Sequence, residues 1–219
     1  MLKIDAQGMV VDAKVKPKRF AQIERQPLTE VRGIIVHQTG AGRAESAFNS
    51  YATANANGAH FLIEKDGTIY QTASVQNRTN HVGPLRARCL AEYACKPAEF
   101  NKSKTFPQSG LVQRMHKIEM QKSVPARYPS NVDSIGIEIV GKPELPPGKT
   151  APANATPKQK EMFFNQNAVY EAVTSAQNLS LQWLVGELAQ TLEVPKSEVF
   201  RHPEVSRKSP TEASTANWQ

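Results

Sequence analysis

The chain has 219 residues, of which 39% are hydrophobic and 21% are charged. This composition excludes a disordered or fibrous protein, and no apolar run reaches the roughly 18 to 20 residues that a membrane span requires. The net charge of +7 favours contact with polyanions, but the basic residues are scattered and only 7% of residues are aromatic, so no nucleic-acid partner is expected.

The first part of the chain predicts short strands and one helix. Residues 1–30 predict a short strand pair that leads into a connector. Residues 31–38, VRGIIVHQ, have the length and β-branched content of a buried strand, and residues 43–55 carry apolar side chains at helical spacing. Residues 60–73, HFLIEKDGTIYQTA, alternate around Lys-Asp-Gly at 65–67, which predicts a β-hairpin.

The second part predicts a long irregular segment, a strand and a helix. Residues 84–131 contain prolines and many basic residues and predict an irregular insertion. Residues 134–140, SIGIEIV, predict another buried strand. Residues 141–158 hold five prolines and two glycines, which predicts a loop, and residues 159–193 predict one long helix. Residues 199–219 have no predicted regular structure.

The predicted long helix has an apolar face. Its members are Phe163, Phe164, Val169, Val173, Leu181, Leu184, Val185 and Leu188. Because strands and helices alternate along the chain, we expect an α/β fold: a central mixed β-sheet flanked by helices. We expect one domain over residues 1–219, with an N-terminal extension at 1–30 and an insertion at about 84–131.

The two cysteines, Cys89 and Cys95, lie close together within ARCLAEYACKP. Two interpretations remain open: a pair of free thiols, or a local disulfide that clips the insertion. A disulfide would require an oxidising compartment such as the periplasm. Their spacing fits neither a zinc ribbon nor a thioredoxin motif.

A few polar residues lie where chemistry is expected. His37 ends the first buried strand, and the carboxyl ends of such strands are where active sites gather. Glu138 interrupts an apolar strand, where a carboxylate is costly unless it has a function. His202 follows the long helix, and Lys208 and Glu212 come six and ten positions later. Two histidines and a carboxylate can form a hydrolytic zinc site, with a separate carboxylate as base.

Five sequence blocks, taken in order, resemble those of a known family. The blocks are VRGIIVHQTG, NGAHFLIEKDGTIYQTA, NHVG, SIGIEIVG and RHPEVSRKS. They are similar to the amidase-2 superfamily, which groups AmpD-type N-acetylmuramoyl-L-alanine amidases, the phage T7 lysozyme type and the peptidoglycan recognition proteins. The resemblance covers residues 30–83 and 132–213, and it leaves the first 30 residues and the insertion unexplained. It implies a zinc cleft at one sheet edge and zinc-dependent cleavage of the bond between N-acetylmuramic acid and L-alanine in peptidoglycan.

The resemblance also implies roles for single residues. His37 and His202 match the first two zinc ligands. Glu138 matches the glutamate that positions or deprotonates the attacking water, and Lys208 matches the lysine that stabilises the oxyanion. His81 in NHVG matches a histidine that lines the substrate cleft, although the residue before it is not the family's usual tryptophan.

The third zinc ligand departs from the family pattern. Related chains place Asp or Cys after the lysine, whereas this chain reads Lys-Ser-Pro-Thr-Glu at 208–212. In one interpretation, Glu212 supplies the carboxylate at the same distance from His202 as the usual Asp. In the other, Ser209 stands in the ligand position, and the protein is a non-catalytic peptidoglycan-binding module. The first interpretation is favoured because Glu138 and Lys208 would have little purpose in a pure binder.

The place of action is a further expectation. The first 20 residues carry charges throughout and lack the uninterrupted apolar region of a secretory signal. We therefore expect a bacteriolytic enzyme that reaches the periplasm or cell wall by non-classical export, such as a secretion-system effector or a phage lysin. A cytoplasmic recycling enzyme is the alternative. A toxic effector would be accompanied by a cognate immunity protein.

Overall fold

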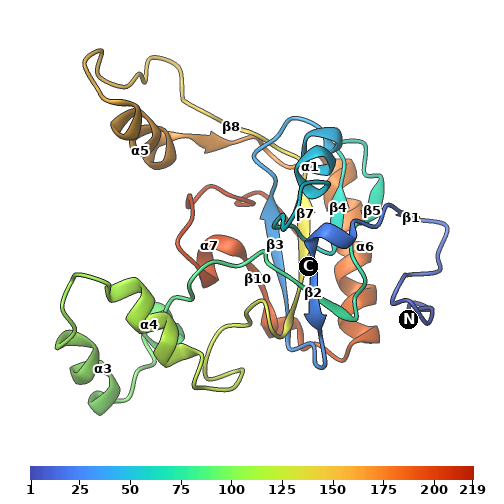
Figure 1. Cartoon of the computed structure of the whole chain (residues 1–219), viewed down its shortest axis with the longest axis horizontal. Coiled ribbons are helices and arrows are strands. Elements are labelled where there is room, and N and C mark those ends of the chain that lie inside the picture. The colour runs from blue at the N-terminus through green and yellow to red at the C-terminus, as the bar shows by residue number, and fades with distance from the viewer.

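A computed structural model describes residues 1–219 and shows a six-stranded sheet with the order β1-β5-β4-β7-β3-β10 (Figure 1). The strands are β1 (Val15–Pro17), β3 (Gly33–Gln38), β4 (Phe61–Ile63), β5 (Ile69–Gln71), β7 (Ser134–Ile139) and β10 (Val199–Arg201). Strands β4, β7, β3 and β10 run parallel, and β5 runs antiparallel to β4. The mixed α/β architecture predicted from the sequence is confirmed.

The chain has seven α-helices. They are α1 (Ala44–Tyr51), α2 (Arg88–Ala91), α3 (Pro97–Lys104), α4 (Leu111–Glu119), α5 (Pro157–Asn167), α6 (Ser175–Thr191) and α7 (His202–Val205), with 3-10 turns η1 (Ala21–Ile23) and η2 (Lys196–Glu198). Two small antiparallel sheets pair β2 (Glu24–Pro27) with β6 (Asn77–Thr79), and β8 (Pro143–Glu144) with β9 (Val169–Tyr170). None of these helices is both long and apolar enough to cross a membrane.

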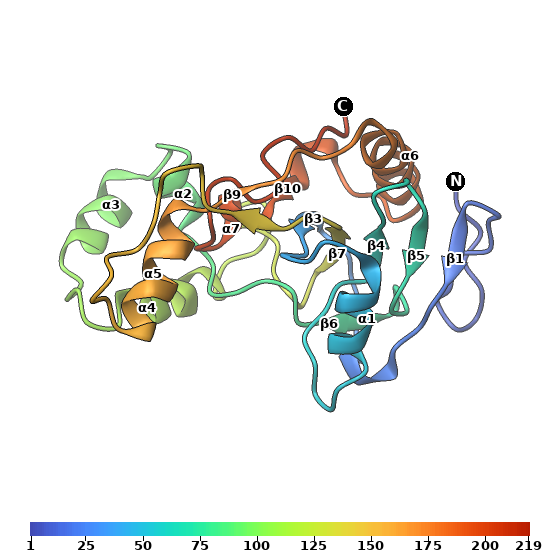
Figure 2. The ribbon, with the colours of Figure 1, turned by 90° about the horizontal axis from the view of Figure 1, so that it is seen from above.

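The two faces of the sheet pack against different partners. Seen from above, the central strands lie between α6 and α1 (Figure 2). Ile34 and Val36 of β3 belong to the core cluster that includes Leu184 of α6, whereas Ile35 belongs to a separate cluster with Val205 of α7. Because successive strand residues point to opposite faces, the side chain of His37 lies on the Ile35 face, away from α6.

The predicted hairpin is confirmed by the antiparallel pairing of β4 and β5. Gly67 in its turn has a φ of 85°, and a Cβ there would lie 2.8 Å from the backbone oxygen of Ala176. Glycine is therefore required both by the backbone conformation and by the close approach of α6. The predicted strand pair at 1–30 is only partly correct, since β1 pairs with β5 and β2 pairs with β6.

The single long helix predicted over residues 159–193 is wrong. The structure has two helices, α5 and α6, separated by β9. Thr156 and Thr174 each form a capping box with the glutamine three residues later, so the chain starts a helix twice. Phe164 and Val169, assigned to the apolar face, are 36% and 48% exposed.

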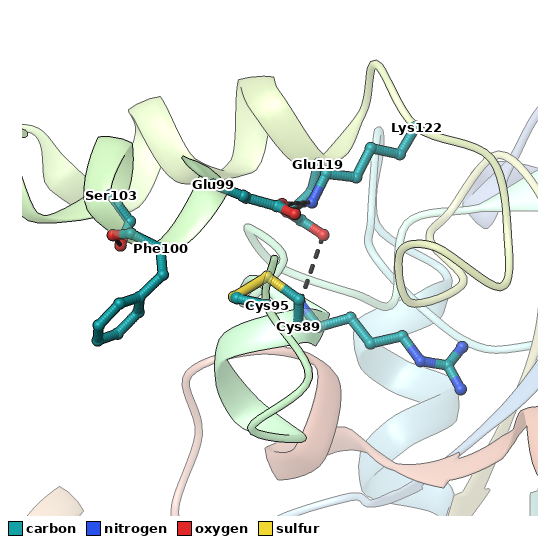
Figure 3. Close-up of a disulfide and its surroundings, with 8 residues drawn as sticks. Cys89, Cys95, Glu99, Phe100, Ser103, Glu119 and Lys122 are labelled. Atoms are coloured by element: carbon teal, nitrogen blue, oxygen red, sulfur yellow. Dashed lines mark hydrogen bonds and ion pairs between the residues drawn. A yellow bond between two sulfur atoms is a disulfide. The ribbon is translucent and has the colours of Figure 1, made fainter. Parts of the chain in front are cut away.

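Two segments predicted to be irregular contain regular structure. The 84–131 segment forms α2, α3 and α4, which project away from the sheet in both views (Figures 1 and 2). Cys89 and Cys95 form a disulfide in this segment, so the disulfide interpretation of the cysteines is the one that the structure supports (Figure 3). The last segment contributes β10, which pairs with β3, and then the short helix α7.

Candidate metal centre and active site

The site lies at the carboxyl ends of the two central strands. His37 of β3 and Glu138 of β7 are register partners in the parallel sheet. Register partners point to the same face, so both side chains leave the sheet on the side opposite α6. The apolar strand composition thus positions a buried imidazole and a carboxylate next to each other.

His202 and Glu212 reach the same place from the last part of the chain. His202 is the first residue of α7, directly after β10, which is hydrogen-bonded to β3. The Nδ1 atoms of His37 and His202 are 2.8 Å apart. Glu212 Oε1 lies 3.0 Å from His202 Nδ1 and 3.7 Å from His37 Nδ1. Three donor atoms that are far apart in the sequence therefore converge on one point, and all three residues are buried.

A chain of hydrogen bonds sets the orientation of His37. The Ser134 hydroxyl donates to the backbone oxygen of Ser130, so Ser134 Oγ is left to accept from His81 Nε2. His81 Nδ1 then accepts from His37 Nε2, at 2.9 Å. This assignment leaves the lone pair of His37 Nδ1 facing the other two donor atoms. Such outer hydrogen bonds are the usual means by which a metal-binding histidine is held in one tautomer.

The hydrogen bonds through His81 require a glycine beneath its ring. The ring of His81 lies over Gly136 of β7, where a Cβ would be 2.7 Å from His81 Nδ1. Any larger residue at position 136 would push the His81 ring away from His37. The glycine of the SIGIE block is therefore explained by the packing of a histidine against the strand.

The donor set fits a zinc ion. Two imidazole nitrogens and one carboxylate oxygen are the ligands of many hydrolytic zinc sites, which leave a further position open. The only two buried side-chain nitrogen or oxygen atoms without a hydrogen-bond partner in the molecule are Glu138 Oε2 and His202 Nε2, and both residues line this cleft. Lone pairs that face one another, and polar atoms without a hydrogen-bond partner, are costly in a protein interior. A bound cation would remove the repulsion between the three converging lone pairs.

The site shifts the pKa values of its members in opposite directions. Burial, with repulsion from Glu212, raises the pKa of Glu138 to about 8. Burial also acts on Glu212, but the adjacent His202 and His37 imidazoles outweigh it and lower the pKa of that carboxyl to about 2. Burial and the neighbouring His202 lower the pKa of His37 to about 4. Glu212 is thus kept ionised beside two histidines, whereas the pKa of Glu138 lies close to neutral pH, where a carboxyl can both take up and release a proton.

The site opens into a cleft of about 480 Å³. All six residues that the sequence singled out, His37, His81, Glu138, His202, Lys208 and Glu212, line this cleft. Lys208 is exposed at its rim. Ser209, the alternative at the third ligand position, does not line it, and its hydroxyl bonds to Thr211 Oγ1 at 3.0 Å.

Sequence reasoning missed several residues that shape the site. Ser134 ends the hydrogen-bond chain through His81, and it is the first residue of the SIGIE block, two positions before the glycine. Gln38 follows His37 and accepts a hydrogen bond from the Ala213 backbone, which ties the segment carrying Glu212 to β3. Tyr170 of β9 lines the cleft, and burial raises its pKa. The only sequence feature that could have pointed to Ser134 and Gln38 is that they lie within the quoted blocks. No sequence feature pointed to Tyr170.

Sequence and structure comparisons now place the chain among known proteins. The profile of Amidase_2, N-acetylmuramoyl-L-alanine amidase, matches residues 27–214. The chain belongs to the Amidase_2 family. The amidase-2 resemblance predicted from the sequence blocks is thereby confirmed. No curated protein is significantly similar to this Amidase_2 chain in sequence.

Two solved structures share the fold of this Amidase_2 protein. A selenomethionine derivative of AmpD is 16% identical, with a TM-score of 0.53, over 99% of this chain and 96% of that chain. AmpDh3 from Pseudomonas aeruginosa is 17% identical, with a TM-score of 0.50, over 98% of this chain and 63% of that chain. At these identities the likeness shows the fold alone.

Proposed function

We propose that this Amidase_2 protein is a zinc-dependent hydrolase that cuts the amide between N-acetylmuramic acid and L-alanine in peptidoglycan. The observation that carries the proposal is the convergence of His37 Nδ1, His202 Nδ1 and Glu212 Oε1 within 4.8 Å of one another. These three residues would hold the zinc ion. When bound, zinc would supply the Lewis-acid chemistry that makes water nucleophilic near neutral pH.

The other residues of the cleft have separable tasks in this proposal. Glu138 takes the proton of the attacking water and returns it to the departing nitrogen of alanine, which suits a carboxyl with a raised pKa. The Lys208 ammonium, at the rim, stabilises the negative charge that develops on the carbonyl oxygen. His81 holds His37 in the tautomer that faces the site.

The test is mass spectrometry of purified peptidoglycan digested with and without a zinc chelator. The wild-type protein should release intact stem peptides, and the chelator should stop the release. Glu138→Ala should lower the rate by about 10² to 10⁴, the usual contribution of a general base, while still retaining zinc. Glu144→Ala is the matched control, because Glu144 is exposed and lies outside the cleft.

Binding of the wall without release would overturn the proposal in favour of a recognition module. Such a module would need neither Glu138 nor zinc. The position of Ser209, bonded to Thr211 and outside the cleft lining, supports Glu212 rather than Ser209 in the third ligand position.

We also propose that the protein acts on the cell wall outside the cytoplasm as a bacteriolytic enzyme, for example a secretion-system effector with a cognate immunity protein. The Cys89–Cys95 disulfide supports this place of action, because disulfides persist in oxidising compartments. Directed to the periplasm of a bacterial host, the protein should lyse the cells, and the same chain kept in the cytoplasm should not. A Glu138→Ala protein that lyses equally well would contradict the proposal.

A further inference from the structure

A second cavity lies beside the catalytic cleft. It measures about 530 Å³ and is lined by the 84–131 segment on one side and by residues 203–210 on the other. Lys208 lines both the cleft and this cavity. The backbone also connects them, since residues 80–83 line the cleft and residues 84–87 line the cavity. A ligand that occupies the cleft can therefore continue into the second cavity past Lys208.

The second cavity combines an apolar floor with positive charge. Leu85, Leu90 and Met115 contribute to the floor, and Arg86, Arg207 and Lys208 are its charged residues. No acidic residue lines the cavity. The Arg86 guanidinium already donates to the backbone oxygen of Pro203, whereas Arg207 is exposed beside Lys208. Such a lining suits an extended ligand with aliphatic parts and a carboxylate.

The opposite end of the cleft has different chemistry. Beyond the candidate metal ligands its wall carries the hydroxyl and amide side chains of Thr39, Ser46, Ser50 and Asn57. Ser46 and Ser50 belong to α1, which lies on the other side of α7 from the 84–131 segment (Figures 1 and 2). Uncharged hydrogen-bonding groups suit the hydroxyl and acetamide groups of a sugar.

We propose that the substrate lies across the site in one direction, with the glycan toward α1 and the peptide stem in the second cavity, where Arg207 binds a carboxylate of the stem. This inference rests on the proposed function. The bond to be cut divides a chain of neutral sugars from a peptide that ends in a carboxylate and has a second free carboxylate on its glutamate. The charge difference between the two ends of the groove matches the charge difference between the two parts of the substrate.

The experiment measures binding by calorimetry, with the full chain carrying Glu138→Gln so that ligands stay intact. The ligands are an N-acetylmuramoyl pentapeptide with lysine at the third position, the same compound with an amidated C-terminus, and a third with the free carboxylate of its glutamate amidated. Adding Arg207→Glu should weaken binding of the first ligand about fivefold to tenfold, as expected for reversing one charge of an exposed ion pair. One of the two amidated ligands should be insensitive to the substitution, and that ligand identifies which carboxylate is bound.

Lys158→Glu is the matched control, because it makes the same change of charge. Lys158 is exposed on α5 and lines neither the cleft nor the second cavity. It should change no affinity by more than about twofold. Equal weakening of all three ligands by Arg207→Glu, or no weakening of any, would overturn the inference. A wild-type protein that binds the ligands with this pattern but never cleaves them would overturn the proposed function alone.

Discussion

The cleft and the second cavity together form a groove, and its two walls are stabilised in different ways. The wall that carries His37 and Glu138 belongs to the central sheet, where all six residues of β3 are buried. The wall formed by the 84–131 segment has almost no core of its own, since none of residues 88–118 is buried. Burial of apolar side chains stabilises the sheet-side wall, and it contributes much less to the wall formed by the 84–131 segment.

The second wall is instead fastened at α2. The guanidinium of Arg88 bonds both carboxylate oxygens of Glu198, at 3.0 and 2.7 Å, and lies over the rings of Tyr128 and Phe200. The disulfide then joins Cys89, the next residue, to Cys95. Farther along, Lys122 bonds Glu119 and Glu99, which links the ends of α4 and α3 (Figure 3). We therefore expect the sheet-side wall and the wall formed by the 84–131 segment to respond separately to substitution.

The largest effect is expected when the sheet-side site loses a metal ligand. Glu212→Ala should abolish zinc retention and lower hydrolysis by well over about 100-fold, since even outer partners of a ligand contribute tenfold to 100-fold. The near-ultraviolet circular dichroism should stay close to that of the wild type. Zinc content measured by atomic emission checks the prediction, with exposed Glu161→Ala as control. A variant that keeps one zinc per chain would show that Glu212 is not a ligand.

The next effect concerns stability and compares the two regions directly. Leu184 of α6 is fully buried against the sheet, whereas Leu111 of α4 is only half-buried beside the second cavity. Leu184→Ala should lower the free energy of unfolding by about 2 to 5 kcal/mol, and Leu111→Ala by less than about 1 kcal/mol. Urea denaturation followed by fluorescence measures both. Equal losses would mean that the 84–131 segment is part of the cooperative core.

The sheet side should also respond to acid. His60 is fully buried; its Nδ1 accepts from the Gly136 backbone and its Nε2 donates to the Asn77 oxygen. Burial lowers the pKa of His60 to about 4 from an ordinary value of 6.5. The unfolded chain therefore binds more protons between these values, so the stability is fully present above about pH 6.5 and is lost as the pH falls toward 4. The contribution is on the order of 3 kcal/mol.

Thermal unfolding of the metal-free protein between pH 7.5 and 4.5 measures this dependence. In His60→Gln, the glutamine amide can donate and accept hydrogen bonds at the same place but does not titrate. The melting temperature of this variant should depend less on pH than that of the wild type, even if its stability at pH 7.5 differs. A profile as steep as that of the wild type would assign the acid sensitivity to other groups, such as His37 and His81, whose pKa values are also lowered by burial.

The smallest effect is expected on the other wall. Closing the short loop between Cys89 and Cys95 is worth about 2 kcal/mol in the chain-entropy account. Because the surrounding helices bury no apolar side chain, we expect Cys89→Ser with Cys95→Ser to speed amide hydrogen exchange in α2 to α4 only. The melting temperature and the exchange of β3 and β7 should stay unchanged. Faster exchange throughout the sheet would show that the two walls are coupled.

Much of the site could be predicted from the sequence, but its assembly could not. His37 and Glu138 were identifiable because polar residues stand out in short apolar strands. Their partners His202 and Glu212 come from a segment with no predicted regular structure, and only the pairing of β10 with β3 brings them into place. The role of Ser134 depends on a contact with His81, 53 residues away, that no local pattern encodes.

The sequence by itself determined the buried strands, the β4–β5 hairpin, the α/β class and the membership of the family, because these depend on local periodicity, turn chemistry and the order of motifs. The break between α5 and α6 follows from two local capping boxes, Thr156 with Gln159 and Thr174 with Gln177, that the prediction of one long helix did not use. Tertiary structure decided the helices of the 84–131 segment and the pairing of the cysteines. In those regions the apolar pattern is weak, so capping, strand pairing and contacts between distant segments outweigh local preference. The second cavity belongs to this group, since its two sides are more than 70 residues apart in the chain.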